Sequence, residues 1–246
     1  GFTFTDRVGG SCMHINHGPG GRERAGRGQR TRATSRRTFL KWSGITIGVA
    51  AIGCSSDKTV GPGGSVSLGT GDTAVLNYAY VLEQLEAAFY IKVVSGFYGG
   101  STAAEQQLLT DVRDHEVIHR DFFKAALGAN AVAALEFDFS SVTFSDRTSV
   151  LTTARVFEDL GVSAYNGAGP LIQDPNYLLA AGKIVSVEAR HAAAIRDLLS
   201  PRNAASGFAG DDVVDANGLD GAKVPSAVLA AAGTYVTATI DASNLP

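Results

Sequence analysis

Apolar positions recur at helical spacing over four long stretches of the chain. In the first, residues 72–94, the stripe runs through Leu76, Tyr80, Glu83, Ala87, Tyr90 and Val94. Asp72 suits the N-cap of this helix, and the glycines of GFYGG follow its end. The stripe turns the carboxylate of Glu83 towards the core, where burial is costly unless cations or hydrogen bonds compensate it.

The second helix is predicted to begin with a capping box and to be followed by a long connection. Thr102 and Glu105 form the box, and the helical pattern continues to Leu127. Within the connection, residues 128–146, the segment FDFSSVTF alternates like a short strand. A helical hairpin needs only a few linking residues, so this length favours a crossover that runs along a bundle.

Two further long helices and a shorter one are predicted after the connection. The third should span residues 146–168, and the fourth should begin at Asp174, with a proline at its first position, and stop at Pro201. A loop rich in Gly, Asp and Asn, residues 202–224, then leads to a short fifth helix over residues 225–236.

Two of these helices carry the same pair of side chains, Glu116 with His119 and Glu188 with His191. Residues three apart share one face of a helix, so carboxylate and imidazole point the same way. From Cys54 onward the chain has seven Glu and three His in 193 residues. Random placement would produce about 0.1 such pairs, whereas a Glu-x-x-His on each of two facing helices is a motif of dinuclear metal sites.

The helix before each pair contains a glutamate followed seven residues later by a tyrosine. These are Glu83 with Tyr90 and Glu158 with Tyr165. Seven residues make nearly two helical turns, so each tyrosine lies on the same face as its glutamate. The order predicts a helical hairpin followed by its copy.

This order resembles the ferritin-like superfamily, and LNYAYVLEQLEAAFY resembles the opening helix of bacterial and fungal members related to plant desiccation-related proteins. The resemblance covers about residues 72–200. It implies an all-α fold, a ferritin-like four-helix bundle with a long crossover between helices two and three, to which we add a short C-terminal helix. It also implies six metal ligands: Glu83, Glu116, His119, Glu158, Glu188 and His191.

The implied cofactor is a pair of Fe or Mn ions, because mixed carboxylate and imidazole ligation suits these metals. Glu116 and Glu188 are the candidates for bridging the two ions. The only methionine, Met13, lies far upstream of the helices, so we expect no haem held by methionine.

Residues beside the predicted ligands have more than one interpretation. Glu86 lies one turn after the first glutamate and is either an acceptor that supports the ligands or an additional ligand, although its counterpart in the copy is Gly161. Tyr90 and Tyr165 either donate hydrogen bonds to ligating carboxylates or are ordinary core aromatics. His115 points about a hundred degrees away from the adjacent ligand, so we expect it to face solvent or an interface.

The N-terminal segment predicts export. Residues 1–41 carry a net charge of plus 7, which leaves minus 10 for the remainder of a chain whose total is minus 3. This basic block lacks interleaved aromatic residues, so we expect no nucleic-acid partner. SRRTFLK, residues 35–41, matches the twin-arginine export signal, and the apolar run of residues 42–53 is too short to span a bilayer.

AIGC, residues 51–54, resembles a lipoprotein processing site with Cys54 as the lipidated residue. The alternative is a signal-peptidase cut nearby that leaves Cys54 as a free thiol. We expect a periplasmic or cell-envelope protein that contacts the membrane only through such an anchor. Cys12 is the only other cysteine and lies upstream of the signal, so we expect no disulfide in the mature domain.

Four segments follow from these patterns: an extension and signal peptide (residues 1–53), a flexible tether (54–71), the bundle (72–200) and a C-terminal loop with a short helix (201–246). The favoured function is a dinuclear metal protein that oxidises Fe(II) or consumes O2 or peroxide. The alternative is a non-catalytic envelope scaffold for stress or desiccation, without a functional metal. Iron storage in a cage is a third possibility and depends on oligomeric assembly.

Overall fold

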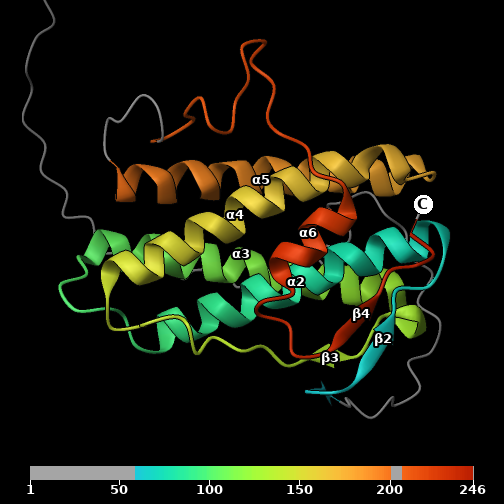
Figure 1. The fold of residues 1–246 in the computed structure, drawn as a ribbon. Helices are drawn as coiled ribbons and strands as arrows, with labels where there is room; N and C mark the ends of the chain where they lie inside the picture. Colours follow the sequence, from blue (N-terminus) through green and yellow to red (C-terminus); the bar gives the residue numbers. More distant parts are fainter. Residues whose placement is uncertain (1–58, 201–206, 246) are drawn as a thin grey trace, which may run out of the picture. The chain divides into compact units, whose positions relative to one another are not determined.

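Four long helices dominate the computed structural model, which describes residues 59–200 and 207–245 (Figure 1). They are α2 (Gly71–Ser95), α3 (Ala103–Leu127), α4 (Arg147–Ala168) and α5 (Pro175–Leu199). Helix α2 packs against α3 and α4 packs against α5, and α2 also contacts α4. The predicted fold class, a four-helix bundle with a short additional C-terminal helix, is confirmed.

Side-chain caps fix where three of these helices begin. The capping box of α3 is confirmed: the Thr102 hydroxyl accepts from the Glu105 amide at 3.2 Å, and the Glu105 carboxylate accepts from the Thr102 amide at 2.8 Å. Asp146 caps α4 by accepting from the Ser149 amide, and Asp174 caps α5 in the same way. These ends agree with the boundaries expected from the sequence.

The predicted N-cap of α2 is wrong. Thr70 occupies that position, without a side-chain hydrogen bond, and Asp72 lies inside the first turn. The carboxylate of Asp72 instead accepts from the backbone amides of Gln173 and Asp174, both at 2.8 Å. It therefore joins the start of α2 to the start of α5, and its charge complements the positive end of the α2 dipole.

Two buried amide side chains fasten the long crossover to α2. The crossover contains η1 (Gly128–Asn130) and β3 (Ala134–Leu135). Asn77 donates to the Asn130 carbonyl at 2.9 Å and accepts from the Val132 amide at 2.9 Å, while Gln84 accepts from the Leu135 amide at 2.9 Å. Asn77 and Gln84 lie seven residues apart and so share one face of α2, which is thereby covered by the crossover.

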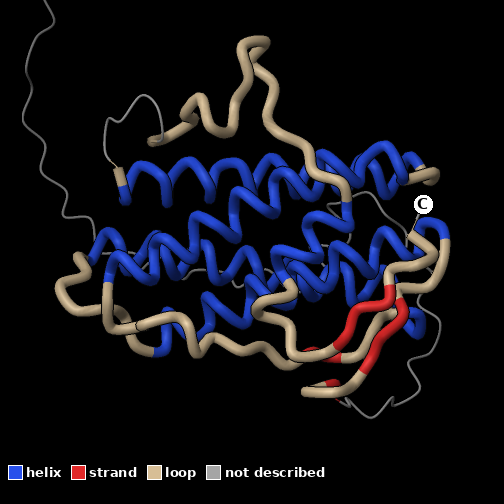
Figure 2. Tube along the Cα trace, viewed as in Figure 1, coloured by secondary structure: helices blue, strands red, loops and turns tan. Residues whose placement is uncertain are grey.

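The predicted strand in FDFSSVTF is wrong, and Figure 2 shows this segment as loop. Only Phe137 pairs, in an isolated antiparallel bridge with Val236. The alternating aromatic residues instead pack on α2: the ring centroids of Phe139 and Phe144 lie 5.9 and 5.8 Å from that of Phe89. Burial of these rings, and not strand pairing, accounts for the alternation.

The expected flexible tether ends earlier than predicted. Residues 59–71 contain β1 (Thr59–Val60) and β2 (Ser65–Ser67), each the member of a two-stranded parallel sheet (Figure 2). Strand β1 pairs with β3, and β2 pairs with β4 (Thr239–Asp241). Val66 and Leu68 of this segment are buried, and Val60 is partly buried. Residues 54–58, like the export signal, lie outside the described residues.

The C-terminal segment packs on the bundle, as predicted, through α6 (Pro225–Ala232), which contacts α4. The helix is shorter than expected because Gly233 ends it, and Tyr235 then turns its ring onto Phe157 at a centroid distance of 4.8 Å. Within the described ranges, no helix has both the length and the hydropathy that a membrane span needs.

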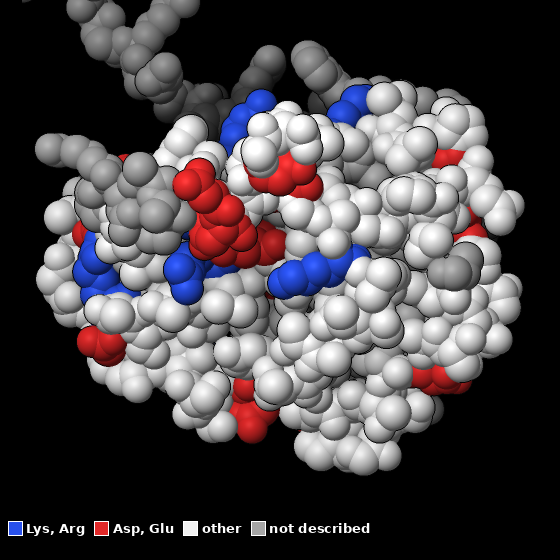
Figure 3. Space-filling view, turned by 45° about the horizontal axis from the view of Figure 1, so that its top comes forward, with Lys and Arg blue, Asp and Glu red and all other residues white. Residues whose placement is uncertain are grey.

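An arginine that is 2 % exposed, Arg196 of α5, joins α4 to the loop before α6. Its guanidinium donates two hydrogen bonds to Asp159, at 2.8 and 3.0 Å, and two to Asp212, at 2.9 and 2.8 Å. The loop thus has a fixed attachment to the bundle. The face shown in Figure 3 carries acidic and basic side chains in mixed groups.

We expect Arg196→Ala to lower the free energy of unfolding by about 2 kcal/mol, because hydrogen bonds to charged groups contribute in this range and both aspartates would lose their partner. Urea unfolding followed by circular dichroism measures the change. The control is Arg190→Ala on the exposed face of the same helix, which should stay within about 0.5 kcal/mol of the wild type. Equal effects of the two substitutions would contradict the assigned role of Arg196.

Candidate metal centre

The predicted ligands lie together in the middle of the bundle. They come from all four long helices: Glu83 from α2, Glu116 and His119 from α3, Glu158 from α4, and Glu188 and His191 from α5. The four carboxylates are 0 % exposed and the two imidazoles 5 %. Their residue types and their depth fit metal ions better than solvated charge.

The ligand atoms form two overlapping groups of four, each within 4.8 Å of one another. One group comes from Glu83, His119 and two further glutamates, and the other from Glu158, His191 and the same two. The shared residues are Glu116 and Glu188. They stand between the groups, where a carboxylate can offer one oxygen to each of two ions.

Contacts within the cluster cross from one Glu-x-x-His pair to the other. The Nδ1 atom of His119 lies 2.8 Å from Glu188 Oε1, and that of His191 lies 2.8 Å from Glu116 Oε1. Both pairs are close, yet neither Nδ1 has a hydrogen-bond partner of suitable geometry. Each imidazole nitrogen therefore lies close to a carboxylate oxygen, and a metal ion could bind to both atoms.

Unpartnered polar atoms are concentrated in this cluster. Among the described residues, eleven buried side-chain nitrogen and oxygen atoms lack a hydrogen-bond partner, and eight of them belong to the six predicted ligands. Burying a polar atom without a partner costs free energy, and natural proteins keep few of them. Metal ions would satisfy all eight.

Two tyrosines donate hydrogen bonds to Glu83 and Glu158, the glutamates that belong to only one ligand group each. Each tyrosine binds the glutamate of the other helical hairpin. Tyr90 of α2 donates to Glu158 Oε1 of α4 at 2.5 Å, and Tyr165 of α4 donates to Glu83 Oε1 of α2. A tyrosine two turns along the same helix is about 10 Å from its own glutamate, which is too far for contact. Antiparallel packing of α2 and α4 brings the partners together instead.

A fifth carboxylate, that of Glu86, lies beside the ligands and is 4 % exposed. Gly161 of α4 makes room for it: a Cβ atom at that position would lie 3.1 Å from Glu86 Oε1 and 3.8 Å from Glu188 Oε2. A larger residue at position 161 would press on the Glu86 carboxylate, so the glycine leaves the space that Glu86 occupies. Burial, and then the neighbouring carboxylates, raise the pKa of Glu86 well above its usual value.

His115 reaches the centre from the surface. It is exposed, as expected, but its Nδ1 atom lies 2.9 Å from Nε2 of His191, and the two rings stack with centroids 5.2 Å apart. The prediction that His115 points away from the ligands missed this contact, because the adjacent helix α5 brings the outer edge of His191 to the α3 surface. When His191 donates from Nε2, its Nδ1 lone pair is free to bind a metal ion.

Burial and mutual contact shift the pKa values of the cluster. Burial raises the pKa of Glu116 to about 8 and that of Glu158 to about 7. It would also raise the pKa of Glu188, but the two imidazoles outweigh burial and lower it to about 2. Burial would lower the pKa of His191, but Glu158 and the other carboxylates raise it to about 12, and the pKa of His119 shifts in the same direction. When no metal ion is bound, protons on these groups balance the charge.

The donor set fits two divalent ions. Each of the overlapping groups offers one imidazole nitrogen and oxygens of three carboxylates, a mixture that suits iron or manganese. The four ligating carboxylates carry four negative charges in total, which balance the four positive charges of two divalent ions. Tyr90, Tyr165 and His115 would hold three of the ligands in place.

Comparison with known families gives an independent assignment. The model of the ferritin-like domain matches residues 71–201, which span all four long helices and all six predicted ligands. No curated protein matches the chain. The matched region covers more than half of the sequence, and the chain therefore belongs to the ferritin-like domain family.

Proposed function

We propose that this protein holds a dinuclear iron or manganese centre and uses it to oxidise Fe(II) with O2 or peroxide. The observation that supports the proposal best is the convergence of eight unpartnered buried ligand atoms on two overlapping sites. A core that only needed stability would replace these polar side chains with apolar ones. Their retention favours a metal-dependent activity.

In this proposal each side chain has a defined task. Glu116 and Glu188 would be shared by the two ions, and Glu83 and Glu158 would each hold one. The imidazoles of His119 and His191 would complete the two sets of ligands through Nδ1. Two Fe(II) ions supply two electrons, which with two protons convert O2 into H2O2, or H2O2 into two water molecules.

The surrounding residues keep the ligands oriented and manage protons. Tyr90 and Tyr165 donate to the outer glutamates and so leave the second oxygen of each carboxylate for the metal. His115 links His191 to the surface and offers a path for protons between the centre and solvent. Glu86 lies beside the site, and burial and the neighbouring carboxylates raise its pKa and so favour its protonated form.

We also propose that the protein works outside the cytoplasm. The support is the SRRTFLK sequence and the apolar run that follows it, with Cys54 as a lipid anchor. Membership in the subgroup of desiccation-related proteins is part of the same proposal and is supported by the sequence of the opening helix. A twin-arginine route carries folded proteins, so metal could be loaded before export.

A non-catalytic scaffold for the envelope is the alternative function. It is favoured if the six ligands satisfy one another through protons, as the raised pKa values of the imidazoles permit. Elemental analysis of the purified full chain, followed by O2 uptake on addition of Fe(II), separates the two functions. Two ions per chain and uptake of O2 support the metal protein, whereas an empty site after reconstitution supports the scaffold.

We expect Glu188→Gln to weaken metal binding by more than about 100-fold, because losing a group that only supports a ligand already costs 10- to 100-fold. Isothermal titration calorimetry of the metal-free chain with Mn(II) measures the affinity. Glu136→Gln is the matched control, since Glu136 is an exposed glutamate of the crossover and should bind two ions unchanged. Unaltered binding by Glu188→Gln would refute the ligand assignment.

Metal binding should release protons, and the apparent affinity should rise with pH. The pKa of His191 is raised to about 12 and that of Glu116 to about 8, so both groups hold protons at pH 7 and must lose them to bind a cation. Calorimetry in buffers of different ionisation enthalpy counts the released protons. We expect at least one proton per chain at pH 7 and a weaker affinity at pH 5, and a proton count of zero would contradict the assignment.

A further inference from the structure

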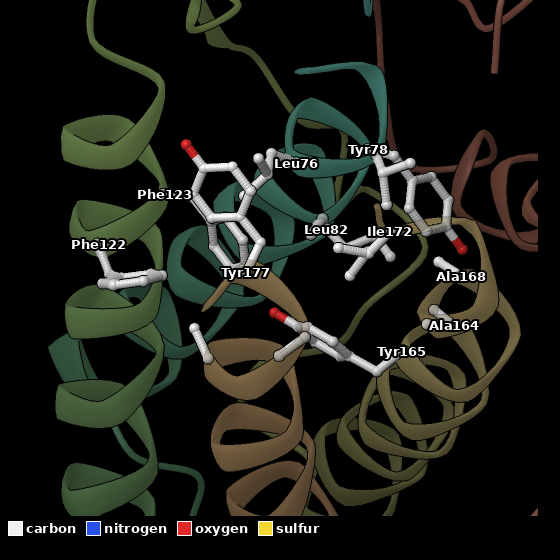
Figure 4. A pocket seen from close by; sticks show the side chains of 15 residues that line it. Leu76, Tyr78, Leu82, Phe122, Phe123, Ala164, Tyr165, Ala168, Ile172 and Tyr177 are labelled. Carbon is white, nitrogen blue, oxygen red and sulfur yellow. The ribbon is translucent and has the colours of Figure 1, made fainter. Parts of the chain in front are cut away.

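A small cavity lies in the bundle next to the ligands. It is enclosed by the first half of α2, the ends of α3 and α4, and the start of α5, and Figure 4 shows side chains from all four helices around it. Its volume is about 20 Å³. A cavity of this size holds a single water-sized or diatomic molecule.

The cavity adjoins one side of the proposed metal centre. Tyr165 forms part of its wall and donates to Glu83. On α2, Leu82 precedes Glu83 directly, and on α3, Phe123 lies one turn after His119. Residues four apart share a face of a helix, so the cavity occupies the layer of the bundle next to the Glu83–His119 side.

The side of the cavity nearest to solvent is where η2 (Gly169–Leu171) meets the start of α5. The lining residues on α2 are buried, whereas Ile172 and Tyr177, at this corner, are partly exposed. The cavity therefore extends inward from the corner towards Tyr165 and Glu83. Ile172 stands at its outer end.

The lining is almost wholly apolar and includes no charged side chain. Its polar side-chain groups are the hydroxyls of Tyr78, Tyr165 and Tyr177 (Figure 4). That of Tyr165 is bound to Glu83, and that of Tyr78 has no partner. Peroxide brings two donors and several acceptors, of which a few tyrosine hydroxyls can meet only some, whereas dioxygen brings no donor and partitions readily into apolar space.

We propose that this cavity is a binding site for dioxygen beside the Glu83–His119 half of the centre. The proposal rests on the proposed function and makes it more specific, since it names O2 and not peroxide as the oxidant admitted from this side. The opposite half of the centre has a polar link to solvent through His115. The two halves of the site therefore differ in what can approach them.

The binding site can be tested in the full chain without any metal, by nuclear magnetic resonance under O2 pressure. Dissolved O2 is paramagnetic and speeds the relaxation of methyl groups near it. We expect the methyls of Ala79 and Leu82, which line the cavity, to relax several-fold faster than that of Ala154, a buried alanine of α4 away from the cavity. Equal relaxation of the three residues would overturn the proposal, because it would mean that O2 does not enter or that water occupies the cavity.

Two substitutions test whether the cavity serves oxidation. Ala168→Leu fills it, and because overpacking can destabilise a core, Ile172→Trp serves as a second variant that narrows only its outer end. Ile91→Trp is the matched control, since Ile91 is 43 % exposed and lies outside the cavity. In chain loaded with Fe(II), the two cavity variants should slow oxidation by O2 several-fold and leave oxidation by added H2O2 unchanged, and the control should slow neither.

The possible failures are distinguishable. If O2 enters the cavity of the metal-free chain but no metal binds, the proposed function fails and the gas site remains. If metal binds and Fe(II) is oxidised at the same rate in all variants, the proposed function stands and the dioxygen site is refuted. Equal slowing of O2 and H2O2 reactions would also refute it, because selectivity for O2 is the core of the inference.

Discussion

Mutual repulsion of buried carboxylates is the constraint that the rest of the bundle accommodates. Five glutamates, each 0–4 % exposed, lie close to one another at the centre, where the low dielectric strengthens every like-charge contact. Such a group is stable only with cations or protons among its members. The surrounding helices contribute imidazoles, tyrosine hydroxyls and an apolar core, and together these hold the acidic groups in a fixed arrangement.

Much of this arrangement follows from local sequence. Helical spacing is enough to place Glu116 and His119 on one face, and a Thr-x-x-Glu box is enough to place the start of α3. Because both hairpins carry the same ligand residues at the same spacing, the sequence also predicts that the two sets face each other inside one bundle. These features depend on residues within two turns of one another, which is the range over which sequence patterns are informative.

Contacts between distant segments were not predictable in the same way. The exchange of tyrosine partners depends on how α2 and α4 align, and the pairing of His115 with His191 depends on how closely α5 approaches α3. Asn77 could not be recognised as the anchor of the crossover, because its partners lie more than fifty residues away. Asp72 was predicted to be an N-cap because aspartate is common at that position. Its carboxylate instead binds the backbone amides at the start of α5, and this contact cannot be recognised from the local sequence.

The ligand set is nearly symmetric, but its surroundings are not. Glu86 has Gly161 as its counterpart, His115 has Val187, and the apolar cavity adjoins only one half. The two hairpins carry the same ligands at corresponding positions, and they differ at the neighbouring positions Glu86 and Gly161, and His115 and Val187. Two ions bound in this cluster would therefore meet different environments, one nearer apolar walls and one nearer a histidine that reaches solvent.

The exchanged tyrosines have a consequence for how such a centre can arise. In one helical hairpin alone, the glutamate and the tyrosine of the first helix cannot reach each other, so neither has its partner. Two identical hairpins associating side by side would supply both hydrogen bonds at once. The arrangement is thus compatible with an ancestral homodimer whose subunits later became joined in one polypeptide, with the crossover as the joining segment.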